Sequence, residues 1–126
     1  MKKYLFLLVA TVTFFSFTKF QTDDAIVNAL KNGNAEQVAG NFDSFIDLKL
    51  PDKEESKNMG KNQAKIAFAS FFNENGVKGF ELTSRREMGE TMQITGKLQN
   101  AGKGYGITIR LKKQGDKLLI TNVRIN

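Results

Sequence analysis

The sequence contains no cysteine, no histidine and no tryptophan, and it has a single proline. The absence of cysteine excludes disulfide bonds, thiolate nucleophiles and cysteine-based metal sites. The absence of histidine removes the most frequent general base and the most frequent transition-metal ligand, so nucleophiles that rely on histidine are excluded too. Any catalysis would have to use Asp, Glu, Lys, Tyr or Arg, and we predict no metal and no cofactor.

The first twenty residues have the order of a secretory signal peptide. Lys2 and Lys3 precede a short uncharged apolar run, and a polar sequence begins at Gln21. The run is shorter than the roughly 20 apolar residues that a membrane-spanning helix needs, although a retained membrane anchor is the alternative. We therefore predict that residues 1–20 are a signal peptide cleaved between Thr18 and Gln21. The protein is expected to be periplasmic or secreted, without a lipid anchor and without membrane contact after cleavage.

Residues 21–126 are predicted to form one small domain with one hydrophobic core. The full chain has 19 Lys and Arg residues against 13 Asp and Glu residues. Three of the lysines lie in the expected signal peptide, so the remaining basic excess is small. Nucleic-acid-binding proteins concentrate basic residues on one surface, and this composition does not indicate a nucleic-acid partner.

Hydrophobic spacing in the first half of the domain predicts three helices and one strand. A short helix is expected over residues 22–32, and Asn34 is placed to cap a second short helix. Residues 43–50 alternate between apolar and polar side chains, which is typical of a half-buried strand. The charged segment 52–59 is expected to be a loop, and a longer helix is expected over residues 61–75.

After Gly79 the hydrophobic period changes to two residues, which predicts strands. Short glycine-containing turns divide this part into an antiparallel meander of four strands. Matching apolar positions across the turns sets a register that pairs Ser84 with Ile94 and Leu111 with Leu119. The face covered by the helices would then consist of Phe80, Leu82, Met92, Ile94, Leu98, Tyr105, Ile107, Ile109, Leu111, Leu119, Val123 and Ile125.

The same register predicts a polar outer face on the sheet. It assigns Arg85, Leu118 and Ile120 to this face, together with cross-strand rows of Thr, Gln and Arg. No Asp or Glu is expected on the covered face. A solvated polar face is the simplest interpretation of this pattern, and an interface is the functional one.

The order of the expected elements is that of the nuclear-transport-factor-2-like, or cystatin-like, α+β cone. Several stretches also resemble a small family of short exported bacterial proteins, the domain of unknown function 4783 family: residues 31–35 (KNGNA), 50–54 (LPDKE), 61–64 (KNQA), 71–72 (FF) and 119–125 (LITNVRI). The resemblance implies three helices, the third one long, packed on one face of a curved, mainly antiparallel five-stranded sheet. The family has no assigned activity, so the resemblance leaves function open.

Our first functional hypothesis is an exported, non-enzymatic binding domain. It would hold a small apolar or amphipathic ligand between the third helix and the sheet, in a pocket lined by Phe68, Phe72, Met92, Ile94 and Tyr105. An enzyme that uses Tyr105 with a carboxylate is a further hypothesis. It needs an Asp or Glu within hydrogen-bond reach of that pocket, and we predict no catalytic residues.

The alternative function is a protein-interaction or homodimerisation module. It would use the polar outer face of the sheet through Arg85, Gln93, Thr95, Arg110 and Asn122. Flat sheet faces rich in Thr, Arg and Gln can pair back to back in a dimer, and arginine is frequent in interfaces.

Overall fold

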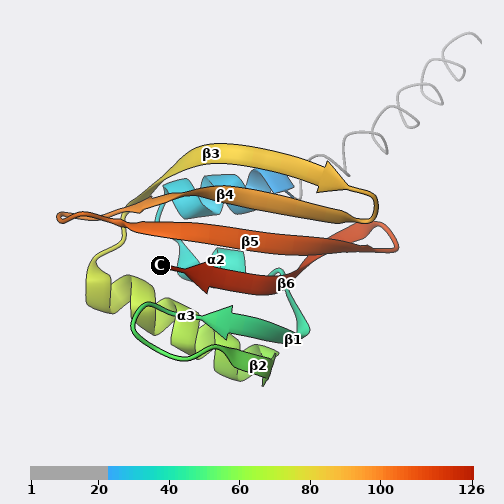
Figure 1. Ribbon diagram of the computed structural model, residues 1–126, viewed down its shortest axis with the longest axis horizontal. Helices are drawn as coiled ribbons and strands as arrows, with labels where there is room; N and C mark the ends of the chain where they lie inside the picture. Colours follow the sequence, from blue (N-terminus) through green and yellow to red (C-terminus); the bar gives the residue numbers. More distant parts are fainter. Residues whose placement is uncertain (1–22) are drawn as a thin grey trace, which may run out of the picture.

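Six strands form one curved sheet, and three helices lie against one of its faces (Figure 1). The computed structural model describes residues 23–126, so the predicted signal peptide of residues 1–20 lies outside the described part. A helix covers residues 23–31. The elements that follow are α2 (Ala35–Ala39), β1 (Phe42–Lys49), β2 (Ser56–Gly60), α3 (Lys61–Asn75), β3 (Gly79–Met88), β4 (Thr91–Gln99), β5 (Tyr105–Gln114) and β6 (Lys117–Ile125).

The order of the strands in the sheet is β2-β1-β6-β5-β4-β3. Strand β1 pairs parallel to β6, and all the other neighbours are antiparallel. The predicted α+β arrangement is therefore confirmed, but the sheet has six strands and not five. The additional strand, β2, lies in the segment that was expected to be a loop. It forms the sheet edge, and its exposed polar residues give no hydrophobic period to detect.

Local sequence signals set the ends of the helices. Asn34 caps α2 as predicted, because its Oδ1 accepts a hydrogen bond from the backbone N–H of Gln37 at 3.1 Å. Helix α3 ends at Gly76, which adopts a left-handed conformation with φ of 59°. Glycine carries no Cβ and takes this conformation at little cost.

A row of aromatic rings packs α3 against the sheet. The ring centroids of Phe42 and Phe68 are 5.6 Å apart, and those of Phe68 and Phe72 are 4.6 Å apart. The row continues through Phe71 to Tyr105, with 5.1 Å between the last two centroids. Such pairs add about 0.5–1.5 kcal/mol each beyond the burial of their area, so this row ties the long helix to both β1 and β5.

Strand register was predicted correctly where the strands run without interruption. Strands β4 and β5 pair Ile94 with Ile109 and Leu98 with Tyr105, as expected. In β3 the register shifts between Leu82 and Ser84, so that Arg85, and not Ser84, lies opposite Ile94. The predicted pairing of Ser84 with Ile94 is wrong because Thr83 is an extra residue, a β-bulge, which exchanges the two faces of the strand beyond it.

A second β-bulge changes the faces of β6. The register shifts between Arg110 and Leu111, so that Leu111 pairs with Ile120 and not with Leu119. Ile120 and Leu118 are consequently buried in the core, and their predicted position on the outer face is wrong. The extra residue in β6 is Thr121, whose hydroxyl lies 3.3 Å from the carbonyl oxygen of Arg110.

Arg85 points toward the helices because of the bulge in β3. Its Nη1 lies 3.1 Å from Asp23 Oδ2 and 3.2 Å from Asp24 Oδ1. The side chain of Asp23 is 6% exposed and that of Arg85 is 33% exposed. This ion pair joins the start of the first described helix to β3, and it corrects the prediction that Arg85 lies on the outer face.

We expect Arg85→Ala to lower the free energy of unfolding by about 1–3 kcal/mol, because Asp23 would remain buried without its cationic partner. Urea denaturation followed by circular dichroism measures this loss. Arg86→Ala is the matched control, since Arg86 pairs with Gln93 and is exposed. Equal effects of the two substitutions would contradict the structural role of the ion pair.

Gly96 in β4 lies under the ring of Phe80. A Cβ at this position would overlap the Phe80 ring and the carbonyl oxygen of Glu81. Gly106, in the neighbouring strand, has no atom within 4 Å of an added Cβ. The sheet therefore requires glycine at position 96 for space and not at position 106.

We expect Gly96→Ala to destabilise the protein by about 1–3 kcal/mol, since the added methyl group must displace Phe80 or the β3 backbone. Gly106→Ala should leave stability nearly unchanged. Thermal and urea unfolding of both variants test the comparison, and a neutral Gly96→Ala would show that β3 moves away freely.

Candidate functional site

The open face of the sheet carries two rows of side chains that cross four strands. Among the helices of residues 23–126, none covers this face, which is turned to the viewer in Figure 1. The strand pairings define the rows. They are Arg86, Gln93, Arg110 and Asn122 in the first row, and Ser84, Thr95, Thr108 and Arg124 in the second.

Asp47 of β1 accepts a hydrogen bond from Asn122, the residue at the β6 end of the first row. Its Oδ2 accepts a hydrogen bond from Asn122 Nδ2 at 3.3 Å, and its Oδ1 accepts one from the backbone N–H of Asn58 at 3.0 Å. The Oδ1 of Asn122 lies 2.8 Å from the hydroxyl of Thr121, which donates to it. This network fixes the orientation of the Asn122 amide and ties β6 to β1 and β2.

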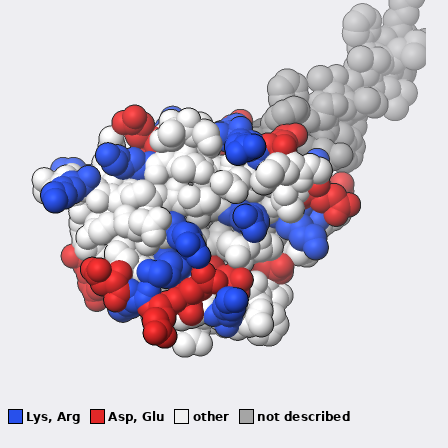
Figure 2. Space-filling model, in the orientation of Figure 1, with Lys and Arg blue, Asp and Glu red and all other residues white. Residues whose placement is uncertain are grey.

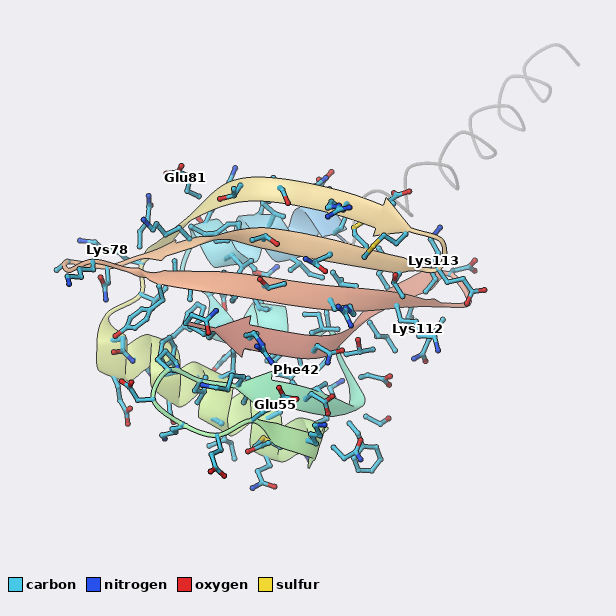
Figure 3. All side chains as sticks on the ribbon, viewed as in Figure 1. Phe42, Glu55, Lys78, Glu81, Lys112 and Lys113 are labelled. Atoms are coloured by element: carbon cyan, nitrogen blue, oxygen red, sulfur yellow. The ribbon has the colours of Figure 1, made fainter. Side chains whose placement is uncertain are left out.

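Arg124 and Glu55 form the ion pair at the edge of the same face. Arg124 Nη2 lies 2.9 Å from Glu55 Oε1. Glu55 comes from the connection between β1 and β2, and Figure 3 shows it beside β1. Exposed ion pairs contribute about 0–1 kcal/mol to the free energy of unfolding. The main effect of this pair is to place a negative and a positive charge side by side on the face.

A depression of about 290 Å³ lies between these groups. Arg110 is exposed at this depression, and within residues 23–126 no carboxylate lies within 4.0 Å of its guanidinium. Figure 2 shows a largely neutral central surface above a lower part where acidic and basic side chains gather. The arrangement presents a free guanidinium next to the Asp47 and Glu55 carboxylates.

Four of the five predicted interface residues lie on this face: Gln93, Thr95, Arg110 and Asn122. Gln93, Arg110 and Asn122 line the depression. Arg85 lies on the opposite face, as described above. The role of the four residues in an interface stays a prediction.

Sequence reasoning missed the acidic side of the depression. Asp47 belongs to the segment that was expected to be a half-buried strand, but nothing indicated that it would lie beside Asn122, because the parallel pairing of β1 with β6 joins distant segments. Glu55 belongs to the segment 52–59, which was expected to be a loop. No local signal in the sequence identifies either contact.

The predicted ligand-lining residues lie mostly in the core. Phe68, Phe72, Met92 and Ile94 are each 5% exposed or less, whereas Tyr105 is half-buried. A ligand between α3 and the sheet would therefore require these side chains to move. Their role in ligand binding stays a prediction.

The hydroxyl of Tyr105 donates a hydrogen bond to Oδ1 of Asn75 at 2.9 Å. Its partner is a neutral amide, although the Glu74 carboxylate lines the same hollow as Tyr105, so the enzyme hypothesis stays a prediction. Among the described residues, no group of three or more Asp and Glu side chains is arranged to hold a metal ion. None of the described helices is both long enough and apolar enough to cross a bilayer.

Solved structures share the fold of this chain. A domain of unknown function 4783 family protein from Bacteroides ovatus is 24% identical with a TM-score of 0.74, and the match covers 80% of this chain and 90% of that one. Its counterpart from Bacteroides uniformis is 22% identical with a TM-score of 0.74, over 82% and 94% of the two chains. No curated protein matches the sequence.

More distant structures identify the fold class. A cystatin-fold protein from Novosphingobium aromaticivorans matches with a TM-score of 0.62 at 11% identity, over 86% of this chain and 97% of that chain. A nuclear-transport-factor-2-like protein of unknown function from Cytophaga hutchinsonii has a TM-score of 0.58 at 11% identity, over 86% and 88%. The fold is therefore nuclear-transport-factor-2-like, as the order of the elements predicted. The model of the domain of unknown function 4783 family matches residues 23–126, and the chain belongs to that family.

Proposed function

We propose that this protein is an exported, non-enzymatic interaction module, and that the outer face of its sheet binds a second copy of the same chain. The observation that supports this most directly is the free guanidinium of Arg110 in a depression that also contains Asp47 and Glu55. A surface that carries both charges next to each other can complement itself.

Two-fold symmetry makes such a patch self-complementary. In a two-fold symmetric dimer every contact between two different residues occurs twice. If residue i of the first copy contacts residue j of the second, residue j of the first copy also contacts residue i of the second. Arg110 of one copy can therefore meet the carboxylates of Asp47 and Glu55 of the other copy, twice per dimer, next to the Arg124 that pairs with Glu55. Arginine is also frequent among the residues that contribute most to binding energy.

The neutral part of the face would form the rest of the contact. Gln93, Thr95 and Thr108 are half-buried by their own neighbours, so they lose little side-chain freedom when a partner covers them. They carry no charge to desolvate, and charged residues are depleted in the centre of interfaces. The proposed contact thus has the neutral side chains of Gln93, Thr95 and Thr108 at its centre, with Arg110 beside them and the carboxylates toward β1.

The proposal of a non-enzymatic function rests on the composition and on Tyr105. The complete sequence has neither histidine nor cysteine. The only tyrosine of the described residues donates its hydroxyl proton to the amide of Asn75, and a neutral amide does not act as a general base.

We expect the protein to be dimeric and Arg110→Glu to weaken the dimer at least about a hundredfold, because it removes two charge-assisted contacts of about 1.5–3 kcal/mol each. Sedimentation velocity over a concentration series measures the dissociation constant. Lys31→Glu is the control, since it makes the same change of charge on the exposed side of the helix at residues 23–31. A protein that is monomeric at every concentration, or a dimer unaffected by Arg110→Glu, would overturn the proposal.

The interior-ligand hypothesis has one supporting observation of its own. Tyr105 lies at the open end of the aromatic row, 5.1 Å from the ring of Phe71, and it is half exposed. The row therefore has a polar rim through which a small amphipathic molecule could reach Phe72 and Phe68 after a movement of side chains.

Native mass spectrometry of protein purified from the periplasm of cells that express the full chain tests this second candidate. A retained molecule should appear as added mass that is lost on denaturation, and Ile94→Trp should abolish it by filling the space beside α3. The denatured mass also reports whether cleavage occurs between Thr18 and Gln21. Protein without added mass in every preparation would count against an interior ligand, and an uncleaved chain would count against export.

A further inference from the structure

An elongated groove runs along α3, beside the connection between β1 and β2. It consists of two adjoining hollows of about 240 Å³ and about 160 Å³. Leu50, Lys53 and Ala67 line both of them, so the two hollows adjoin and together make up the groove. Figure 1 shows the connection between the two strands passing alongside the helix.

The two ends of the groove differ in polarity. Leu48 and Met59 line the smaller hollow together with Leu50 and Ala67, and they form an apolar floor. Ser70, Glu74, Asn75 and Tyr105 line the opposite end, where hydrogen-bonding groups predominate. A ligand that matches this surface has an apolar body and one polar end.

The hydrogen bonds at the polar end leave acceptors free. Tyr105 already donates its hydroxyl proton to Asn75, so the lone pairs of the Tyr105 oxygen remain available. Asn75 Nδ2 donates to the carbonyl oxygen of Phe71 at 2.9 Å, and Asn100 Nδ2 donates to the carbonyl oxygen of Asn75 at 2.9 Å. These bonds hold the end of α3 in place, and the polar group of a ligand can donate a hydrogen bond to the Tyr105 oxygen.

The charges of the groove favour a cation. Asp52, Glu54 and Glu74 line it with three carboxylates, while Lys53 is the ammonium group in the lining. Within residues 23–126, no cationic group lies within 4.0 Å of these carboxylates. The ammonium of Lys49 is a second cation close to the groove, where it donates to the carbonyl oxygen of Leu50 at 2.7 Å, so three carboxylates face two ammonium groups.

Aromatic rings add to this preference. The rings of Tyr105 and Phe71 meet edge to face at 5.1 Å beside the polar end. A cation close to the face of an aromatic ring gains about 0.5–1 kcal/mol at an exposed site. Carboxylates, free oxygen acceptors and aromatic rings together form the surroundings that suit an ammonium group.

We propose that this groove binds an amphipathic amine. Its ammonium group would lie between the Tyr105 oxygen and the Glu74 carboxylate, and its apolar body would lie along Leu50 toward Met59. The site is separate from the outer face of the sheet, because no residue lines both this groove and the Arg110 depression. It therefore does not depend on the proposed dimer.

Three probes of equal chain length test the proposal: octylamine, octanol and octanoate. In two-dimensional NMR of the labelled protein, we expect octylamine to shift amide signals of α3 and of the connection between β1 and β2. Octylamine should bind at least about tenfold more tightly than octanoate, because the carboxylate repels Asp52, Glu54 and Glu74. Octanol should bind with intermediate affinity, because it keeps the apolar contact and lacks the charge.

Two variants locate the amine. Glu74→Gln should weaken octylamine binding about fivefold to tenfold and leave octanol binding unchanged, because it removes one charge at the polar end. Glu81→Gln is the matched control on β3, outside the groove. Glu74 is exposed, so the variant is expected to fold, and its unfolding curve checks this.

Ala67→Trp should abolish the binding of all three probes, since Ala67 lines both hollows. Equal affinity for the amine and the carboxylate would overturn the charge argument. Shifts confined to the outer face, or probe binding that survives Ala67→Trp, would overturn the site itself. Loss of dimerisation in Arg110→Glu has no bearing on these results, so the two proposals fail separately.

Discussion

Two β-bulges determine which side chains of this sheet meet the helices and which remain open. Thr83 in β3 and Thr121 in β6 are each an extra residue in an antiparallel pair, and each exchanges the two faces of its strand. One bulge directs Arg85 toward Asp23, and the other brings Ile120 into the core. Bulges also bend and twist a strand, which lets the sheet curve around the helices. Without these two residues neither the core nor the outer face would have its present composition.

The curved sheet leaves two chemically different surfaces around a packed interior. The aromatic row that runs from Phe42 to Tyr105 fills the space between α3 and the sheet. The outer face presents neutral Thr and Gln side chains together with the Arg110 guanidinium, which shares a depression with Asp47, Glu55 and Arg124. The groove along α3, beside the connection between β1 and β2, presents carboxylates and free acceptors above an apolar floor. We therefore place both proposed binding functions at the periphery of the fold, where a partner can be accommodated without loss of core packing.

Sequence patterns located part of the candidate site. The sequence placed Gln93 and Arg110 on one face because β4 and β5 alternate without interruption. It also placed Asn122 on that face, because Asn122 follows the bulge at Thr121 in β6. Arg85 was misplaced, since a bulge adds one residue without changing the types of residue around it. Glu55 was missed because its neighbours come from a strand about seventy residues away in the chain. Contacts of this kind depend on tertiary packing and leave no periodic trace.

The sequence by itself excluded histidine- and cysteine-based chemistry, and it determined the helix boundaries and the class of the fold. The lack of histidine and cysteine is a matter of composition, the cap at Asn34 is a contact over three residues, and the change of hydrophobic period after Gly79 is local. The tertiary structure alone decided the sixth strand, the parallel pairing of β1 with β6 and the positions of the two bulges. The physical reason is that caps and alternation arise from neighbours along the chain. Strand partners and bulges, by contrast, are selected by the burial of the whole sheet against its helices.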